Sequence, residues 1–186
     1  MTTTILLDRD GVINFDSPYY ILSPKDWQPI PGSLEAIAAL TKSGIKIGLC
    51  SNQSALGRGM FQAEEMQAIH QKMMQAIDDT GGHIAHSAYC PHHPDAQCLC
   101  RKPKAGLLIE TLTKLHSEAH DAFMIGDSLR DVQAALAANV EPILVQTGYG
   151  DAKDIAEKAQ HIYPHIGIYP DLKSAIIALK LTSLSA

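Results

Sequence analysis

The sequence predicts an α/β protein in which helices cover both faces of a Rossmann-like parallel sheet. Three observations support this fold class. Apolar segments at residues 3–7, 45–50, 84–89, 122–125 and 142–146 have the length and composition of buried strands. Segments with apolar residues at helical spacing alternate with these strands along the chain. Most of the links are short, which is typical of right-handed crossovers between parallel strands.

Length and composition indicate one domain, residues 1–186. No large insertion separates the first strand from the strand that ends at Ser51, or that strand from Lys102, so we expect no large cap domain. The formal net charge is −5 at pH 7 and there is no run of Lys and Arg, which argues against nucleic-acid binding. No apolar stretch approaches the roughly 20 residues that span a bilayer, and the N-terminus lacks a signal-peptide pattern. We therefore expect a cytoplasmic monomer that acts on a small molecule, with no membrane partner.

The first strand leads directly into a candidate active site. Residues 3–7 are apolar without alternation, and Asp8, Asp10 and Gly11 follow them. A carboxylate at the carboxyl end of such a strand lies where open α/β sheets bind ligands. Two carboxylates one residue apart can divide the work between a nucleophile and a proton donor. The alternative is that Asp8 only caps the junction between strand and turn.

A polar loop over residues 14–31 follows, and its prolines interrupt any regular element. Loops of this length in compact domains are usually functional. Asp16, Tyr19 and Tyr20 are candidate substrate contacts in this loop. Packing at the surface is the alternative interpretation for the two tyrosines.

Helices are expected between the strands, where apolar residues recur at helical spacing. The first should end before Gly44, a good helix terminator. In the longest, Met66, Ile69, Met73 and Ile77 form one face, which we interpret as core. The predicted helices span about residues 33–40, 63–80, 107–115, 128–138, 151–159 and 171–180.

Cys90, Cys98 and Cys100 lie close together in the chain, with His92 and His93 between them. In a chain without a secretory signal, such clustering indicates a metal site rather than disulfides. Three thiolates and one imidazole are the ligands of a closed, structural Zn²⁺ site. Spacing alone does not separate the two adjacent histidines as the fourth ligand.

Polar residues recur at the ends of the predicted strands. Asp8, Ser51 and Asp127 each follow an apolar strand. Lys102 precedes a helix, so one crevice could collect all four side chains. Asp131 lies one turn into the helix after Asp127. It either supplies charge near a helix N-terminus, worth about 0.3–1 kcal/mol, or orients Lys102 or a metal-bound water.

Four motifs, in this order, resemble those of the haloacid-dehalogenase-type phosphatases. They are Asp8-Arg9-Asp10-Gly11, Ser51-Asn52-Gln53, Lys102 and Gly126-Asp127-Ser128-Leu129-Arg130-Asp131. The cysteine segment, about residues 90–103, resembles the zinc loop of the heptose-bisphosphate phosphatases in that superfamily, with His92 as ligand. Histidinol-phosphate phosphatases share part of this resemblance, which covers roughly residues 5–148.

The resemblance implies a two-step hydrolysis of a phosphate monoester. Asp8 would attack phosphorus to form an aspartyl-phosphate, and Asp10 would protonate the leaving oxygen and then activate water. Mg²⁺ would bind Asp8, Asp127 and the backbone carbonyl of Asp10. Ser51 would donate a hydrogen bond to a phosphoryl oxygen, and Lys102 would offset its charge.

The resemblance also implies a substrate, D-glycero-D-manno-heptose 1,7-bisphosphate, cleaved at its 7-phosphate. Histidinol phosphate or another small sugar phosphate is the alternative substrate. A zinc-stabilised binding module without turnover is a third hypothesis, but binding alone needs no nucleophile and acid together. Arg101 would contact a sugar hydroxyl or a second phosphate. The expected substrate contacts are Asp16, Tyr19, Asn52, Gln53, Arg58, Arg101 and Ser128.

Overall fold

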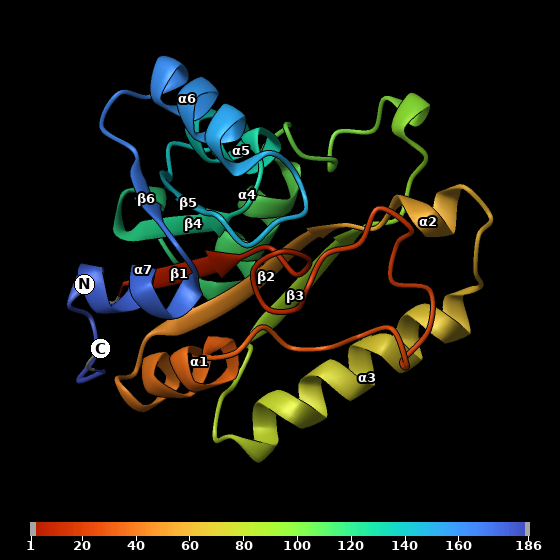
Figure 1. Ribbon diagram of the computed structural model, residues 1–186, viewed down its shortest axis with the longest axis horizontal. Helices are drawn as coiled ribbons and strands as arrows, with labels where there is room; N and C mark the ends of the chain where they lie inside the picture. The colour runs from red at the N-terminus through yellow and green to blue at the C-terminus, as the bar shows by residue number, and fades with distance from the viewer. Residues whose placement is uncertain (1–2, 185–186) are drawn as a thin grey trace.

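The computed structural model describes residues 3–184 and confirms a parallel sheet with helices on both faces (Figure 1). The strands are β1 (Thr4–Leu7), β2 (Lys46–Asn52), β3 (His86–Cys90), β4 (Ala122–Gly126), β5 (Glu141–Val145) and β6 (Gly167–Tyr169). The helices are α1 (Ser33–Lys42), α2 (Ser54–Gly57), α3 (Ala63–Asp79), α4 (Gly106–Leu115), α5 (Leu129–Ala137), α6 (Ala152–Ile162) and α7 (Leu172–Leu179).

The strand order β3-β2-β1-β4-β5-β6 places a topological switch point between β1 and β4. β1 pairs in parallel with β2 on one side and with β4 on the other. The chain builds the sheet outward from β1 to β3 and then crosses back to begin β4. In open α/β sheets, ligands bind at the carboxyl ends of the strands at such a point. We therefore expect the residues that follow β1 and β4 to bind the ligand.

Apolar cores on both faces of the sheet explain why the strands are apolar without alternation. Ile5 and Leu7 of β1 enter the core that α1, α3 and α7 cover, whereas Leu6 enters the core beneath α4 and α5. All three side chains are fully buried. Figure 1 shows α1 and α3 on one side of the sheet and α4, α5 and α6 on the other.

The segment between β1 and α1 has no helix or extended strand, as predicted, but its backbone is well anchored. The Ile30 N–H donates to the Ile13 carbonyl at 2.9 Å. The buried indole of Trp27 donates from Nε1 to Oδ1 of Asn14 at 3.0 Å. These contacts hold the loop across the end of the sheet where β1 stops.

The remaining differences from the sequence prediction are small. The short helix α2 and two single turns of 3₁₀ helix, Pro94–Ala96 and Ala119–Asp121, were not predicted. Segments of three or four residues are too short to show a periodic apolar pattern. β6 belongs to the short α/β unit expected after β5.

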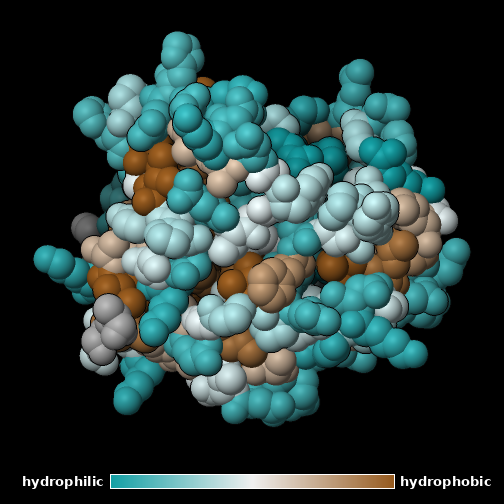
Figure 2. Space-filling model, in the orientation of Figure 1, coloured by the Kyte–Doolittle hydropathy of each residue, from teal (hydrophilic) through white to brown (hydrophobic). Residues whose placement is uncertain are grey.

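The visible face of the molecule is mainly polar (Figure 2). On the face shown in Figure 2, most of the surface is hydrophilic and the apolar groups form small separate patches. Among residues 3–184, no helix combines the length and the apolar character needed to cross a membrane.

Candidate active site

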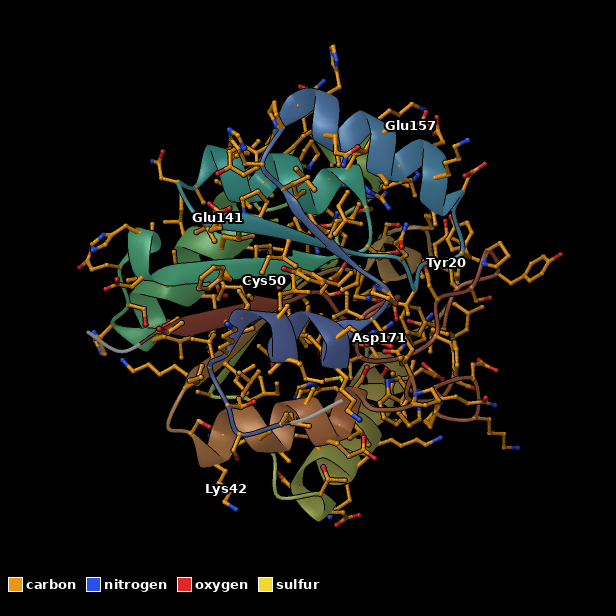
Figure 3. The ribbon with its side chains drawn as sticks, turned by 60° about the vertical axis from the view of Figure 1, so that its left-hand side comes forward. Tyr20, Lys42, Cys50, Glu141, Glu157 and Asp171 are labelled. Carbon is orange, nitrogen blue, oxygen red and sulfur yellow. The ribbon has the colours of Figure 1, made fainter. Side chains whose placement is uncertain are left out.

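A polar pocket opens at the carboxyl ends of the strands beside the switch point. The predicted site residues that line it are Asp8, Asp10, Asp16, Ser51, Asn52, Arg58, Arg101, Lys102, Asp127, Ser128 and Asp131. The pocket also includes Tyr20, which Figure 3 shows among the loops beyond the sheet. Arg130 and Tyr149 line it as well and were not predicted. Tyr19 is 82% exposed and lies outside this lining.

The ammonium group of Lys102 lies at the centre of the site and is 1% exposed. Its Nζ lies 2.9 Å from Oδ2 of Asp8 and 2.6 Å from Oδ1 of Asp131. It also donates a hydrogen bond to the carbonyl oxygen of Cys50 at 2.7 Å. Three acceptors match the three hydrogens of an ammonium group. Burial opposes the charge, but the two carboxylates outweigh it and raise the pKa of Lys102, so the side chain stays cationic.

Asp131 combines the two roles that the sequence left open. Its Oδ2 accepts hydrogen bonds from the backbone N–H of Ser128 at 3.1 Å and from the Ser128 hydroxyl at 2.6 Å, which caps the start of α5. Its other oxygen pairs with Lys102. Burial would raise the pKa of Asp131, but the Lys102 ammonium lowers it below the ordinary value. Asp131 is therefore an ionised carboxylate that orients Lys102.

Carboxylates outnumber cations around Lys102. Burial raises the pKa of Asp127 to about 9, and the nearby carboxylates of Asp131, Asp8 and Asp16 add to this shift. Burial also raises the pKa of Asp8 to about 6, although Lys102 opposes the shift. One ammonium does not balance this much negative charge. The site is therefore suited to a further cation.

The carboxylate oxygens are placed to bind such a cation. Asp8, Asp127 and Asp131 each offer an oxygen, and these atoms lie within 4.8 Å of one another. Two glycines leave room for the Asp127 side chain, since a Cβ on Gly11 or Gly148 would collide with its Oδ2. Gly11 also has a φ of +78°, which other residues rarely adopt. A set of carboxylate oxygens fits a hard cation such as Mg²⁺.

The carboxylate of Asp10 is held by four hydrogen bonds. Arg9 donates from Nε to Oδ1 at 2.9 Å and from Nη2 to Oδ2 at 3.0 Å. Asn14 donates to Oδ1 at 2.9 Å, and Gln53 donates to Oδ2 at 2.9 Å. Burial would raise the pKa of Asp10, but Arg9 and these hydrogen bonds lower it.

Arg9 and Asn14 were not recognised from the sequence. The only local signal for Arg9 is its place between two aspartates at the end of a buried strand. Gln53 was expected to contact substrate, but it is 5% exposed and points inward, toward Asp10 and the Ser51 hydroxyl. Asn52 lines the pocket and bonds through its amide to both backbone groups of Lys102, at 3.0 and 3.1 Å.

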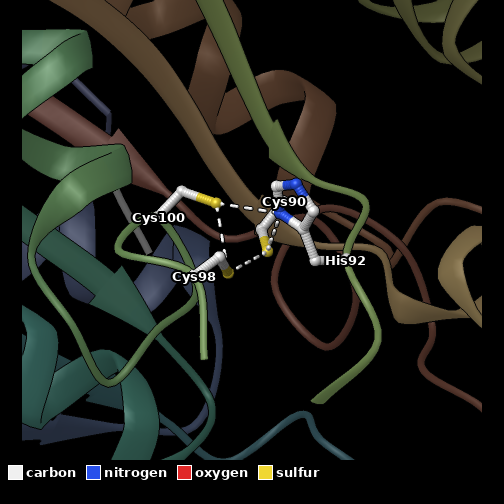
Figure 4. Close-up of side chains that lie close together, drawn as sticks. All are labelled: Cys90, His92, Cys98 and Cys100. Atoms are coloured by element: carbon white, nitrogen blue, oxygen red, sulfur yellow. Dashed lines mark hydrogen bonds between the residues drawn. The ribbon is translucent and has the colours of Figure 1, made fainter. Parts of the chain in front are cut away.

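The cysteine cluster forms a second group of converging donor atoms (Figure 4). The Sγ atom of Cys98 lies 3.6 Å from that of Cys90 and 3.4 Å from that of Cys100. The Nδ1 atom of His92 lies 3.6 Å from the Cys90 sulfur and 3.3 Å from the Cys100 sulfur. A tetrahedral site with Zn–S bonds of about 2.3 Å has sulfurs about 3.7 Å apart. The spacing therefore fits a tetrahedral metal ion.

His93 is not among the residues whose donor atoms converge in this cluster. Its Nδ1 accepts a hydrogen bond from the backbone N–H of Asp95 at 3.2 Å. His92 is therefore the histidine that the fold brings to the three thiols. Arg101 follows Cys100 directly, lines the pocket, and has a buried Nη1 without a hydrogen-bond partner among residues 3–184.

Known proteins resemble this chain over most of its length. A family model described as "HAD-hyrolase-like" matches residues 99–175. The D-glycero-beta-D-manno-heptose-1,7-bisphosphate 7-phosphatase of Pseudomonas putida is 42% identical over 147 residues, which cover 79% of this chain and 84% of that protein. The protein of the same name from Bordetella bronchiseptica is 45% identical over 146 residues, which cover 78% of this chain and 82% of that protein.

A solved structure resembles the whole fold. The crystal structure of D,D-heptose 1,7-bisphosphate phosphatase from B. bronchiseptica, complexed with magnesium and phosphate, superposes with a TM-score of 0.90. It is 38% identical in sequence, and the match covers 96% of this chain and 98% of that chain.

Proposed function

Because this chain belongs to the heptose-1,7-bisphosphate 7-phosphatase family of haloacid-dehalogenase-type hydrolases, we propose that it hydrolyses the 7-phosphate of D-glycero-D-manno-heptose 1,7-bisphosphate. The reaction proceeds with Mg²⁺ through an aspartyl-phosphate on Asp8. The observation that carries this proposal is the group of Asp8, Asp10 and Lys102 in one polar pocket at the switch point of the sheet.

In the first step, a carboxylate oxygen of Asp8 attacks phosphorus in line with the leaving oxygen. Lys102 holds Asp8 at 2.9 Å and is near enough to offset charge on the transferring phosphoryl group. The hydroxyl of Ser51, at the end of β2, donates a hydrogen bond to a phosphoryl oxygen. Asp131 acts through Lys102, because the two side chains are paired at 2.6 Å.

Asp10 moves the proton in both steps. It protonates the leaving sugar oxygen and, once ionised, takes a proton from the water that hydrolyses the aspartyl-phosphate. Each transfer typically contributes about 10²–10⁴-fold to the rate. The contacts around Asp10 favour its ionised form, which the second step needs. A bound phosphate raises the pKa of Asp10 through its own negative charge, which favours the protonated form in the first step.

Mg²⁺ fits the carboxylate centre and would be held by Asp8, Asp127 and the backbone carbonyl of Asp10. When bound, it neutralises the repulsion between the phosphate and these carboxylates. Zn²⁺ fits the second cluster, where Cys90, His92, Cys98 and Cys100 supply four ligands and leave no position for substrate. Its role is structural: it braces the loop that presents Arg101.

Arginines at the pocket favour a bisphosphate over histidinol phosphate. Arg58, Arg101 and Arg130 all line the pocket that contains Asp8. A second phosphate on the substrate can pair with these guanidinium groups. Histidinol phosphate has no second phosphate to pair with them. Asp16 and Ser128 remain proposed contacts to the sugar.

One chain supplies all the proposed catalytic residues, so the proposed reaction requires neither a second domain nor a second copy of the chain. The loop over residues 14–31 and the cysteine loop over residues 90–103 then shape the entrance, without a separate cap domain. An open entrance of this kind admits an extended sugar bisphosphate.

Phosphate release with Mg²⁺ tests the substrate. We expect kcat/KM for heptose 1,7-bisphosphate to exceed that for histidinol phosphate and fructose 1,6-bisphosphate by at least about 10²-fold, or about 2.7 kcal/mol. Both anomers should be assayed, and the remaining product should be the heptose 1-phosphate. Comparable kcat/KM values for all substrates would contradict the heptose assignment while leaving the phosphatase intact.

A further inference from the structure

Arg9 is a buried cation that the proposed mechanism does not use. Its side chain is 1% exposed, although it carries a full positive charge. Removing a guanidinium group from water is costly unless hydrogen bonds and an opposite charge compensate. The carboxylate that pairs with it, among residues 3–184, is that of Asp10. The chain therefore places a buried ion pair directly behind its proposed proton donor.

The contact between Arg9 and Asp10 fixes the plane of the carboxylate. Nε and Nη2 of Arg9 donate to different oxygens of Asp10, at 2.9 and 3.0 Å. Such a bidentate pair constrains orientation as well as distance, which a single hydrogen bond does not. A lysine at this position would keep the charge but lose the planar fork.

Gln53 closes a triangle with these two residues. Its Oε1 accepts a hydrogen bond from Nη2 of Arg9 at 2.9 Å, and its Nε2 donates to Oδ2 of Asp10 at 2.9 Å. The same Nε2 also donates to the hydroxyl of Ser51 at 3.1 Å. Through Gln53, the position of Asp10 is linked to the hydroxyl that would hold the phosphate.

The triangle is also attached to rigid backbone. The carbonyl oxygen of Arg9 accepts hydrogen bonds from the backbone N–H groups of Ile13 and Asn14, at 2.9 and 3.2 Å. Asn14 in turn donates from its side chain to Asp10. The turn after β1 and the donors to Asp10 are therefore one hydrogen-bonded unit.

We propose that Arg9 and Gln53 are positioning residues that hold the carboxylate of Asp10 at the leaving oxygen of the substrate. This inference rests on the proposed function, in which Asp10 transfers the proton. A proton donor must lie within about 2.6–3.2 Å of the atom that it protonates. A displacement of about 1 Å can cost about 10²-fold in rate. The two residues act on the reaction through Asp10 and touch no substrate atom.

The test compares leaving groups in the Arg9→Lys variant. Release of the leaving group is followed in the first turnover, with heptose 1,7-bisphosphate and with p-nitrophenyl phosphate. The alkoxide of the sugar needs a proton to leave, whereas p-nitrophenolate leaves without one. We expect first-turnover release from the sugar to slow by about 10–10²-fold, with KM changed less than about threefold. Release of p-nitrophenolate should change less than about threefold.

A double-mutant cycle separates this role from a general structural one. In an Asp10→Asn background, Arg9→Lys should cause no further loss, because the group that it positions no longer donates a proton. Gln53→Met is the second variant. First-turnover release from the sugar should again slow while release of p-nitrophenolate changes little, and the slowing should be smaller than in Arg9→Lys. It decides the question if Arg9→Lys does not fold.

Equal slowing of both substrates, or an undiminished effect of Arg9→Lys in the Asp10→Asn background, would overturn the positioning role while the phosphatase stands. Failure of the wild-type protein to release phosphate from either ester would overturn the proposed function and this inference together.

Discussion

The two clusters of reactive side chains in this protein are held in opposite ways. The carboxylate centre stands on the ends of β1, β2 and β4, and Lys102 and Asp131 within it are each 1% exposed. In the cysteine cluster, Cys90 is buried at the end of β3, but the other three residues lie on the loop that follows: His92 is exposed, Cys98 and Cys100 are half-buried, and the neighbouring Leu99 is 80% exposed.

This difference indicates what stabilises each cluster. Apolar packing on both faces of the sheet fixes the strand ends, so the carboxylate centre forms when the chain folds. The exposed part of the cysteine loop buries little apolar surface, so under the proposal a bound Zn²⁺ would supply much of its order. The clusters meet at Arg101 and Lys102, which are adjacent in the chain. We therefore assign the chemistry to the first cluster and the selection of substrate to the second.

The largest expected effect comes from Asp8→Asn in the carboxylate centre. Loss of the nucleophile should lower kcat by at least about 10⁴-fold. Lys102 keeps Asp131 as its partner, so the variant should fold and give a wild-type circular dichroism spectrum. Phosphate release at near wild-type rates would show that this cluster does not carry the chemistry.

A pair of lysine variants sharpens the comparison, because the ammonium of Lys102 lies in the carboxylate centre and that of Lys104 bonds to the cysteine loop. Lys102→Met leaves Asp8 and Asp131 without their buried cation, and should lower the free energy of unfolding by about 3–5 kcal/mol as well as abolishing turnover. Lys104 is exposed and donates to the carbonyls of Gln97 and Cys98, at 3.0 and 2.7 Å.

Lys104→Met is the matched control for this pair. It should change the free energy of unfolding by about 0.5 kcal/mol or less. Urea unfolding of both variants gives the two values. Similar losses in the two variants would contradict the claim that the regions are held differently.

Cys98→Ser tests the cysteine loop alone. The wild-type protein should contain about one zinc per chain after a chelator wash, and the variant should contain none. We expect kcat/KM for the bisphosphate to fall by about 10–100-fold while the sheet remains folded. Cys50→Ala is the control, because Cys50 lies within the sheet and outside the cysteine cluster (Figure 3). Burial raises the pKa of its thiol to about 12. The zinc content of this variant should not change. Global unfolding of Cys98→Ser would contradict the claim that the cysteine loop and the sheet are stabilised independently.

The smallest effect concerns His70, which lies behind the carboxylate centre on α3. Its Nδ1 lies 2.8 Å from the hydroxyl oxygen of Tyr89. Burial, and then the charge of Arg9, lower the pKa of His70 below its ordinary value of 6.5. The unfolded chain therefore takes up a proton below pH 6.5 that the folded chain resists. The contribution of His70 to stability should therefore fall as the pH drops from about 7 to about 5, whereas Asp8 and Asp127, whose pKa values are raised in the folded chain, contribute in the opposite sense.

His70→Asn should reduce this dependence, which thermal unfolding at several pH values measures. An unchanged dependence of Tm on pH in the variant would show that His70 is not the group responsible. A fall in stability that begins well above pH 6.5 would point to another group.

Most of the fold and the core of the site could be predicted from the sequence because their signals are local. Asp8, Asp127 and Lys102 stand at the ends or starts of elements whose apolar patterns are clear. Arg9 was missed because its importance depends on a hydrogen bond to Gln53, 44 residues away. An arginine between two aspartates looks like an ordinary exposed charge until the fold buries it.

The sequence spacing also left open whether His92 or His93 is the fourth ligand of the cysteine cluster. Their spacing from the cysteines differs by one residue, so only the path of the backbone after β3 decides which imidazole meets the thiols. Gln53 was expected to contact substrate because a residue that follows a strand can face either the pocket or the interior, and the sequence does not show which. In the structure it bonds to Asp10 and Ser51.

The proposed mechanism depends above all on covalent chemistry at Asp8. Wild-type protein mixed with heptose 1,7-bisphosphate and Mg²⁺ should be quenched in acid during turnover, and its peptides analysed by mass spectrometry. We predict one phosphoryl group on the peptide that contains Asp8. The amount should be larger in Asp10→Asn mixed with p-nitrophenyl phosphate, because that leaving group departs without a proton whereas hydrolysis of the aspartyl-phosphate lacks its base. Continued turnover with no phosphoryl group on that peptide, in either protein, would contradict the account.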